Sequence, residues 1–197
     1  MLNPGTLRKA GGRRIFARFR RDRRGVSALE FALIAPIMIL VYFGMAELSE
    51  AMMAQRRVSH ATSAMGDLVA QHDNAQMPMH LNTDVPNVLA AATDILAPFP
   101  TAPLNLRMTS VVVQSDGSTK VDWSAAQGTA LPQYAQGTSI TVPSGLISTT
   151  QGDSVIMVES SYHYTSPIGY VLPGGLNFGE TFYLKPRKTP YVALVNP

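Results

Sequence analysis

The chain has 197 residues, of which 46% are hydrophobic, with a formal net charge of +3 and no cysteine. This length suits one domain or at most two, and the lack of cysteine excludes disulfide scaffolds, thiol nucleophiles and cysteine-bearing zinc sites. Residues 1–24 carry nine basic side chains and one acid, whereas the remainder carries seven basic and twelve acidic ones. A basic arm on an acidic body is typical of nucleic-acid binding, of a membrane-surface anchor or of a membrane topology signal.

The basic leader, residues 1–25, is followed by an apolar segment at residues 26–46 that contains one charged residue, Glu30. A helix of this length measures about 30 Å, which matches the hydrocarbon core of a bilayer. All the leader cations precede the segment, so the positive-inside rule places the N-terminus in the cytoplasm. Three alternatives fit less well: the buried core helix of a soluble protein, a secretory signal peptide, and a DNA-binding arm, for which the leader offers no recognition fold.

Glu30 needs a partner, because a carboxylate inside a membrane helix costs about 2.5–3.5 kcal/mol. It can reach back to Arg24 or to lipid headgroups. Alternatively, cleavage after Gly25 would create an α-amino group at Val26, about one helical turn from Glu30, which could neutralise the carboxylate on the same chain or on a neighbour. Pro36 is expected to kink the helix or to unwind one of its turns.

Gly25 after a basic run, followed by Glu30-Phe31 in a long apolar helix, looks like a type IV prepilin cleavage signal. With Pro36, residues 24–36 and residues 43–47 more closely resemble the TadE-like family, whose members are minor pseudopilins of the tight-adherence (Tad/Flp) pilus system. A looser similarity to that family lies at residues 162–167 and 185–187, a Tyr-Pro element and a basic end.

The resemblance implies cleavage between Gly25 and Val26 by an aspartyl prepilin peptidase. The mature chain would remain in the inner membrane as a single-pass protein with its C-terminal domain in the periplasm. Glu30, with Phe31 beside it, would be the membrane carboxylate at which subunits dock. The implied partners are the inner membrane, the prepilin peptidase, other pilus and pseudopilin subunits and the Tad secretion platform. Family members act in pilus assembly and not as catalysts.

Residues 47–72 have the pattern of an exposed amphipathic helix that continues out of the membrane. The positions that follow steps of three to four residues are Leu48, Ala51, Met52, Gln55, Val58, Thr62, Met65, Val69 and His72. Residues 73–105 form a connector rich in proline and alanine, with a short helix expected from Asp84 to Leu96. Asp84 is predicted to be its N-cap, with Pro86 in the first turn.

Residues 106–197 have the pattern of a β-rich periplasmic domain. A hairpin is expected at Asp116-Gly117, and residues 125–152 are expected to form a long surface loop. The predicted strands are 106–114, 119–123, 154–164, 180–185 and 191–195. Three to five mostly antiparallel strands packed on the exposed helix would give an α+β fold with a long pilin-like N-terminal helix.

The sequence offers no constellation for catalysis or for metal and cofactor binding. The four histidines have no zinc-site spacing, Asp116 and Asp122 lack the spacing of a calcium loop, and no nucleophile elbow or phosphate loop is present. We therefore expect no catalytic residues, no metal, no cofactor and no nucleic-acid partner. Two alternatives to a pseudopilin stay open: an uncleaved single-pass protein whose periplasmic domain binds or anchors an envelope assembly, and a secreted hydrolase, which the missing catalytic residues disfavour.

Overall fold

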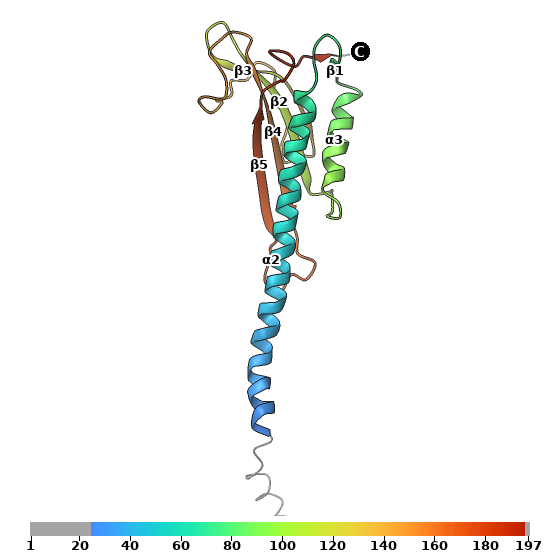
Figure 1. Cartoon of the computed structure of the whole chain (residues 1–197), viewed down its shortest axis with the longest axis vertical. Coiled ribbons are helices and arrows are strands. Elements are labelled where there is room, and N and C mark those ends of the chain that lie inside the picture. The colour runs from blue at the N-terminus through green and yellow to red at the C-terminus, as the bar shows by residue number, and fades with distance from the viewer. Residues whose placement is uncertain (1–24, 196–197) are drawn as a thin grey trace, which may run out of the picture. The chain divides into compact units, whose positions relative to one another are not determined.

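The computed structural model describes residues 25–195, so of the leader predicted at residues 1–25 only Gly25 lies within the described residues. The chain divides into two compact units, residues 1–46 and residues 47–197. The elements, shown in Figure 1, are in chain order α2 (Val26–Ala70), β1 (Met79–His80), α3 (Asp84–Ile95), β2 (Leu104–Val113), β3 (Thr119–Gln127), β4 (Ser154–Tyr164), β5 (Leu176–Leu184) and β6 (Leu194–Val195). The predicted α+β class is confirmed.

Helix α2 is 45 residues long and passes through Pro36 without a break. The expectation that Pro36 unwinds a turn is therefore wrong, and a kink there stays a prediction. A proline removes only one hydrogen bond from the ladder, and no further proline occurs before Pro78. Just beyond α2, the carboxylate of Asp73 accepts the backbone N–H groups of residues 75–77, which reverses the chain.

Four strands form an antiparallel sheet in the order β3-β2-β4-β5. The predicted hairpin joins β2 to β3: Gly117 has φ +78°, and Asp116 accepts hydrogen bonds from the backbone and the hydroxyl of Ser118. Strand β4 has the predicted bounds, whereas β5 begins four residues before the predicted Glu180. Successive side chains along each strand point to opposite faces of the sheet.

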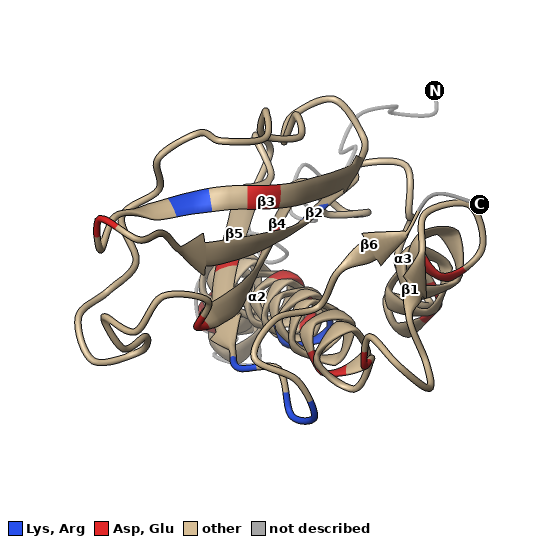
Figure 2. Cartoon of the chain, turned by 90° about the horizontal axis from the view of Figure 1, so that it is seen from above, with Lys and Arg blue, Asp and Glu red and all other residues tan. Residues whose placement is uncertain are grey.

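One face of the sheet packs on α3 and on the part of α2 that belongs to residues 47–197, as the view from above shows (Figure 2). The residues that this part of α2 buries are Glu47, Ala51, Ala54, Val58, Ala61, Thr62, Met65, Gly66, Val69 and Ala70. The predicted face was partly wrong, because Leu48, Met52 and Gln55 are exposed. The other six predicted positions are buried, so the observed stripe overlaps the predicted one and extends it to Glu47, Ala54 and Ala61.

The opposite face of the sheet is covered by the segment between β3 and β4, residues 128–153, which contains no helix or strand. Arg107 on β2 holds this segment: its guanidinium pairs with Glu159 at 2.7 Å and also donates to Tyr134 Oη and to the carbonyl of Pro132. The ion pair itself joins β2 to β4, and both of its side chains are largely buried. The two further donations of the Arg107 guanidinium hold the segment on the sheet.

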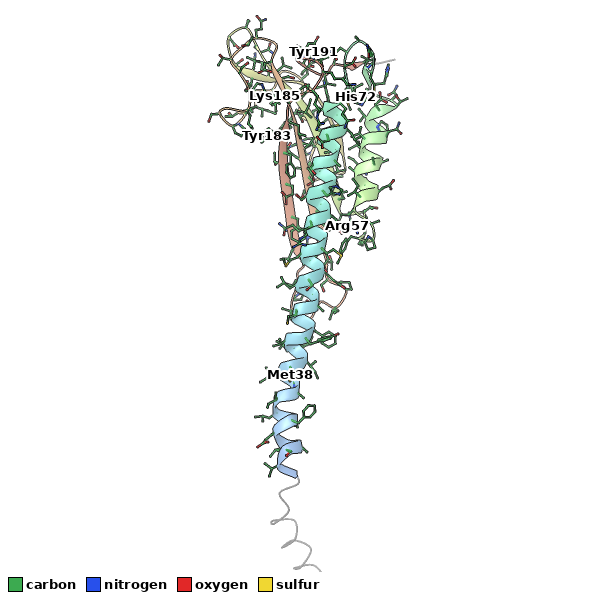
Figure 3. All side chains as sticks on the ribbon, viewed as in Figure 1. Met38, Arg57, His72, Tyr183, Lys185 and Tyr191 are labelled. Atoms are coloured by element: carbon green, nitrogen blue, oxygen red, sulfur yellow. The ribbon has the colours of Figure 1, made fainter. Side chains whose placement is uncertain are left out.

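Helix α3 begins at Asp84, but its N-cap is Thr83, so the predicted N-cap role of Asp84 is wrong. The Asp84 carboxylate instead accepts the backbone N–H of His80 at 2.7 Å, which ties α3 to β1. Strand β1 pairs in parallel with β6. The guanidinium of Arg57, which is labelled in Figure 3, donates a hydrogen bond to the carbonyl of Ile95 and joins α2 to the end of α3.

Candidate functional site

The first candidate site is the beginning of α2. Every residue from 26 to 46 is exposed or half-buried, including Met38, whose side chain points away from the ribbon in Figure 3. Among the described residues, α2 is the one helix long and apolar enough to cross a membrane. A helix that exposes this much apolar surface is unfavourable in water and favourable in a bilayer.

The structure brings three of the predicted site residues together on one helix end. Because α2 begins at Val26, the Gly25–Val26 bond lies directly at its start, and Glu30 is four residues further on the same face. Glu30 and Phe31 are exposed, and Glu30 makes no hydrogen bond or ion pair with any described residue. A methyl group added at Gly25 would meet nothing within 4 Å. Packing within the described residues therefore does not require glycine at position 25.

The second candidate site is Glu47, the first residue of the unit 47–197 and fully buried. Its carboxylate accepts three successive backbone N–H groups from the loop between β4 and β5: Tyr170 at 2.7 Å, Val171 at 3.1 Å and Leu172 at 2.8 Å. Consecutive N–H groups that converge in this way form an anion-binding concavity. The carboxylate of α2 thereby fixes the loop to the helix.

The loop is shaped to present these donors. Ser166 Oγ accepts the N–H groups of Ile168 and Gly169, and Gly169 has φ +63°, a conformation that side chains disfavour. Burial acts to raise the pKa of Glu47, but the three N–H donors and the Ser166 hydroxyl outweigh it, so the pKa lies below its ordinary value. Glu47 is therefore ionised at neutral pH although it is buried.

The sequence analysis did not single out Glu47 as a site, although the resemblance to the TadE-like family includes residues 43–47. A signal was present: Glu47 precedes Ala51 and Ala54 at helical spacing, so it lies on the stripe that the sheet covers. A charged residue on a buried stripe requires a partner. The sequence does not tell which of the later loops supplies that partner.

A cavity of about 570 Å³ lies elsewhere in the unit, lined among others by Asp122, Trp123, Tyr134 and Tyr191. The indole N–H of Trp123 already donates to the carbonyl of Val192 at 2.7 Å, so its polar edge is occupied. Burial raises the pKa of Asp122. Residues 25–195 hold no group of three or more histidine, aspartate or glutamate side chains that could bind a metal ion.

These observations define a class: an α+β protein whose N-terminal helix has the length and composition of a membrane span. Residues 25–65 match the model of the family described as TadE-like protein, so the chain carries a TadE-like domain at these positions. The family is generally non-enzymatic. The match ends before residues 162–167, where the looser similarity was noted. No curated protein and no solved structure matches the chain.

Proposed function

We propose that the chain is a membrane-anchored minor pseudopilin that aids assembly of a Tad/Flp-type pilus. Residues 26–46 span the inner membrane once, with the N-terminus in the cytoplasm and residues 47–197 in the periplasm. A prepilin peptidase cleaves between Gly25 and Val26, and Glu30 and Phe31 then dock on other pilus or pseudopilin subunits or on the Tad secretion platform.

One observation carries the proposal: the TadE-like match begins at Gly25, at the point where α2 begins. The same helix end presents Glu30, a carboxylate with no partner among residues 25–195 and the one charged residue of the segment 26–46. An isolated carboxylate in a membrane requires a positive group. A new α-amino group at Val26, on this chain or on a neighbouring subunit, has the required charge and lies within one helical turn.

The experiment that tests the proposal is N-terminal sequencing of the protein extracted from membranes of cells that make the peptidase. The expected product begins at Val26, and the Gly25→Ala variant keeps residues 1–25. The substitution meets no steric obstacle in the described chain, so a block of cleavage would reflect recognition by the peptidase and not misfolding. Gly174→Ala is the matched control, because a methyl group there also meets nothing within 4 Å, and it should be cleaved normally.

An intact leader in the wild-type protein would sink the cleavage step and favour the uncleaved single-pass alternative. The docking step is tested separately with Glu30→Gln, which keeps the shape of the side chain and removes its charge. Cleavage should persist while co-purification with pilus components is lost. Ser27→Ala, an exposed residue one turn away, is the control. Undiminished co-purification of Glu30→Gln would remove Glu30 from the docking role.

A further inference from the structure

The loop between β4 and β5 carries an apolar surface that the fold does not use. Tyr170 is 69% exposed, Ile168 47% and Val171 45%, although the backbone of this loop is tightly held. No aspartate, glutamate, lysine or arginine occurs between Glu159 and Glu180. Exposed apolar side chains on a charge-free loop are unusual on a surface that meets only water.

The position of this loop follows from its bonds to Glu47. The apolar segment ends at Ala46, and a span that begins at Val26 fills the hydrocarbon core within about 20 residues. Glu47 is the next residue, so in the inserted protein it lies at the boundary between hydrocarbon and headgroups. Because Tyr170, Val171 and Leu172 all donate to its carboxylate, the loop is fixed at that same depth.

From this we infer that residues 167–172 form a second membrane contact, in which Ile168, Tyr170 and Val171 enter the headgroup region of the leaflet facing residues 47–197. The inference rests on the membrane span of the proposed function. Lipid is the occupant that the composition favours: tyrosine with its polar hydroxyl is enriched at membrane interfaces, and aliphatic side chains enter the acyl boundary.

The bonds to Glu47 also explain how a charge can lie at this depth. Three backbone N–H groups stabilise the ionised carboxylate by hydrogen bonds, and Glu47 is fully covered, with 0% of its surface exposed. The same arrangement leaves the side chains of Tyr170 and Val171 free, because only their main chain is used. The loop therefore satisfies the helix with its backbone and presents its side chains to the lipid.

The absence of cysteine from the chain makes a direct test possible. Tyr170→Cys in the full-length protein keeps the backbone bonds and accepts an environment-sensitive fluorophore. The protein is reconstituted in vesicles of phosphatidylethanolamine and phosphatidylglycerol that contain lipid with a spin label at a shallow carbon. Tyr191→Cys is the matched control, 41% exposed. The side chain of Asn74, just beyond the end of α2, donates a hydrogen bond to the carbonyl of Tyr191. The end of α2 lies about 35 Å along the helix from Glu47.

The expected result is a blue shift and quenching by the spin-labelled lipid at position 170, with neither at position 191. Equal, unquenched emission at both positions, in protein that resists alkaline extraction, would overturn the lipid contact and leave the span intact. A blue shift at position 170 that depends on protein density and not on spin-labelled lipid would show a second copy as the occupant and also overturn it. Protein that alkali extracts would overturn the span itself, and with it the proposed function.

Discussion

Helix α2 has one backbone and two environments. Between Val26 and Ala46 no residue is buried, whereas between Glu47 and Ala70 ten are. Large side chains of the first part, such as Leu33, are exposed, whereas the second part buries Met65 and Val69 and leaves Leu48 and Met52 exposed. The difference shows that side-chain hydrophobicity alone does not tell whether the protein covers a helix face, because methionine and valine are exposed in the first part and buried in the second.

The two glutamates make the comparison sharper. Glu30 lies in the apolar part and has no partner among residues 25–195, whereas Glu47 is buried and accepts three N–H groups. A carboxylate away from water requires an opposite charge or hydrogen-bond donors. Glu47 obtains its donors within residues 25–195, whereas Glu30 has none there, so we expect its partner to be Arg24 or a lipid headgroup or, after cleavage, an α-amino group at Val26.

The largest effect is expected from a matched pair of methionines. Met65 is fully buried, and Met65→Ala should lower the free energy of unfolding of residues 47–197 by about 2–5 kcal/mol, since a cavity remains. Met38 is 62% exposed, and Met38→Ala should change it by less than about 0.5 kcal/mol. Chemical denaturation of the full chain in detergent, followed by the fluorescence of the buried Trp123, measures both. Equal effects would break the comparison between the two parts of α2.

A smaller effect is expected at Gly66, which the side chains of Leu184 and Val158 approach closely. A methyl group there would overlap Leu184, and overpacking of this kind costs about 1–3 kcal/mol, partly offset by about 1 kcal/mol of helix propensity. Gly66→Ala should therefore destabilise the unit by about 1 kcal/mol in the same denaturation assay. Gly25→Ala, where no atom lies within 4 Å, should leave its stability unchanged. Stabilisation by Gly66→Ala would show that Leu184 moves aside freely.

The sequence predicted the elements that have a strong local period. The apolar segment, the helix near residue 84 and β4 all follow from residue type and spacing. Strand β5 was recognised only from Glu180, because Asn177 and Gly179 are weak strand formers. Their pairing with His163 and Ser161 of β4 overrides that preference. Two-residue strands such as β1 have no period to detect.

The two candidate sites also differ in how far the sequence could predict them. The site at the beginning of α2 is contiguous in sequence, so Gly25, Val26 and Glu30 could be singled out together. The site at Glu47 joins residues more than 120 positions apart through backbone groups. Backbone N–H groups cannot be recognised from a sequence. Four of the ten buried residues of α2 are alanines, so the larger side chains of Leu48 and Met52 were included in the predicted face although they are exposed.

The smallest effect is expected from Glu47→Gln, because the amide oxygen can still accept some of the backbone hydrogen bonds that the carboxylate accepts. The pKa of Glu47 lies below its ordinary value of 4.5, so its ionised form stabilises the folded unit above that pH, and the contribution is lost as the pH falls through the lowered pKa. The wild type should therefore exceed Glu47→Gln in free energy of unfolding at pH 7, and the gap should close under acid conditions. Glu30→Gln, which lies outside residues 47–197, should match the wild type in this assay at pH 7. A gap that persists unchanged into acid would mean that the hydrogen bonds at Glu47 do not depend on its charge.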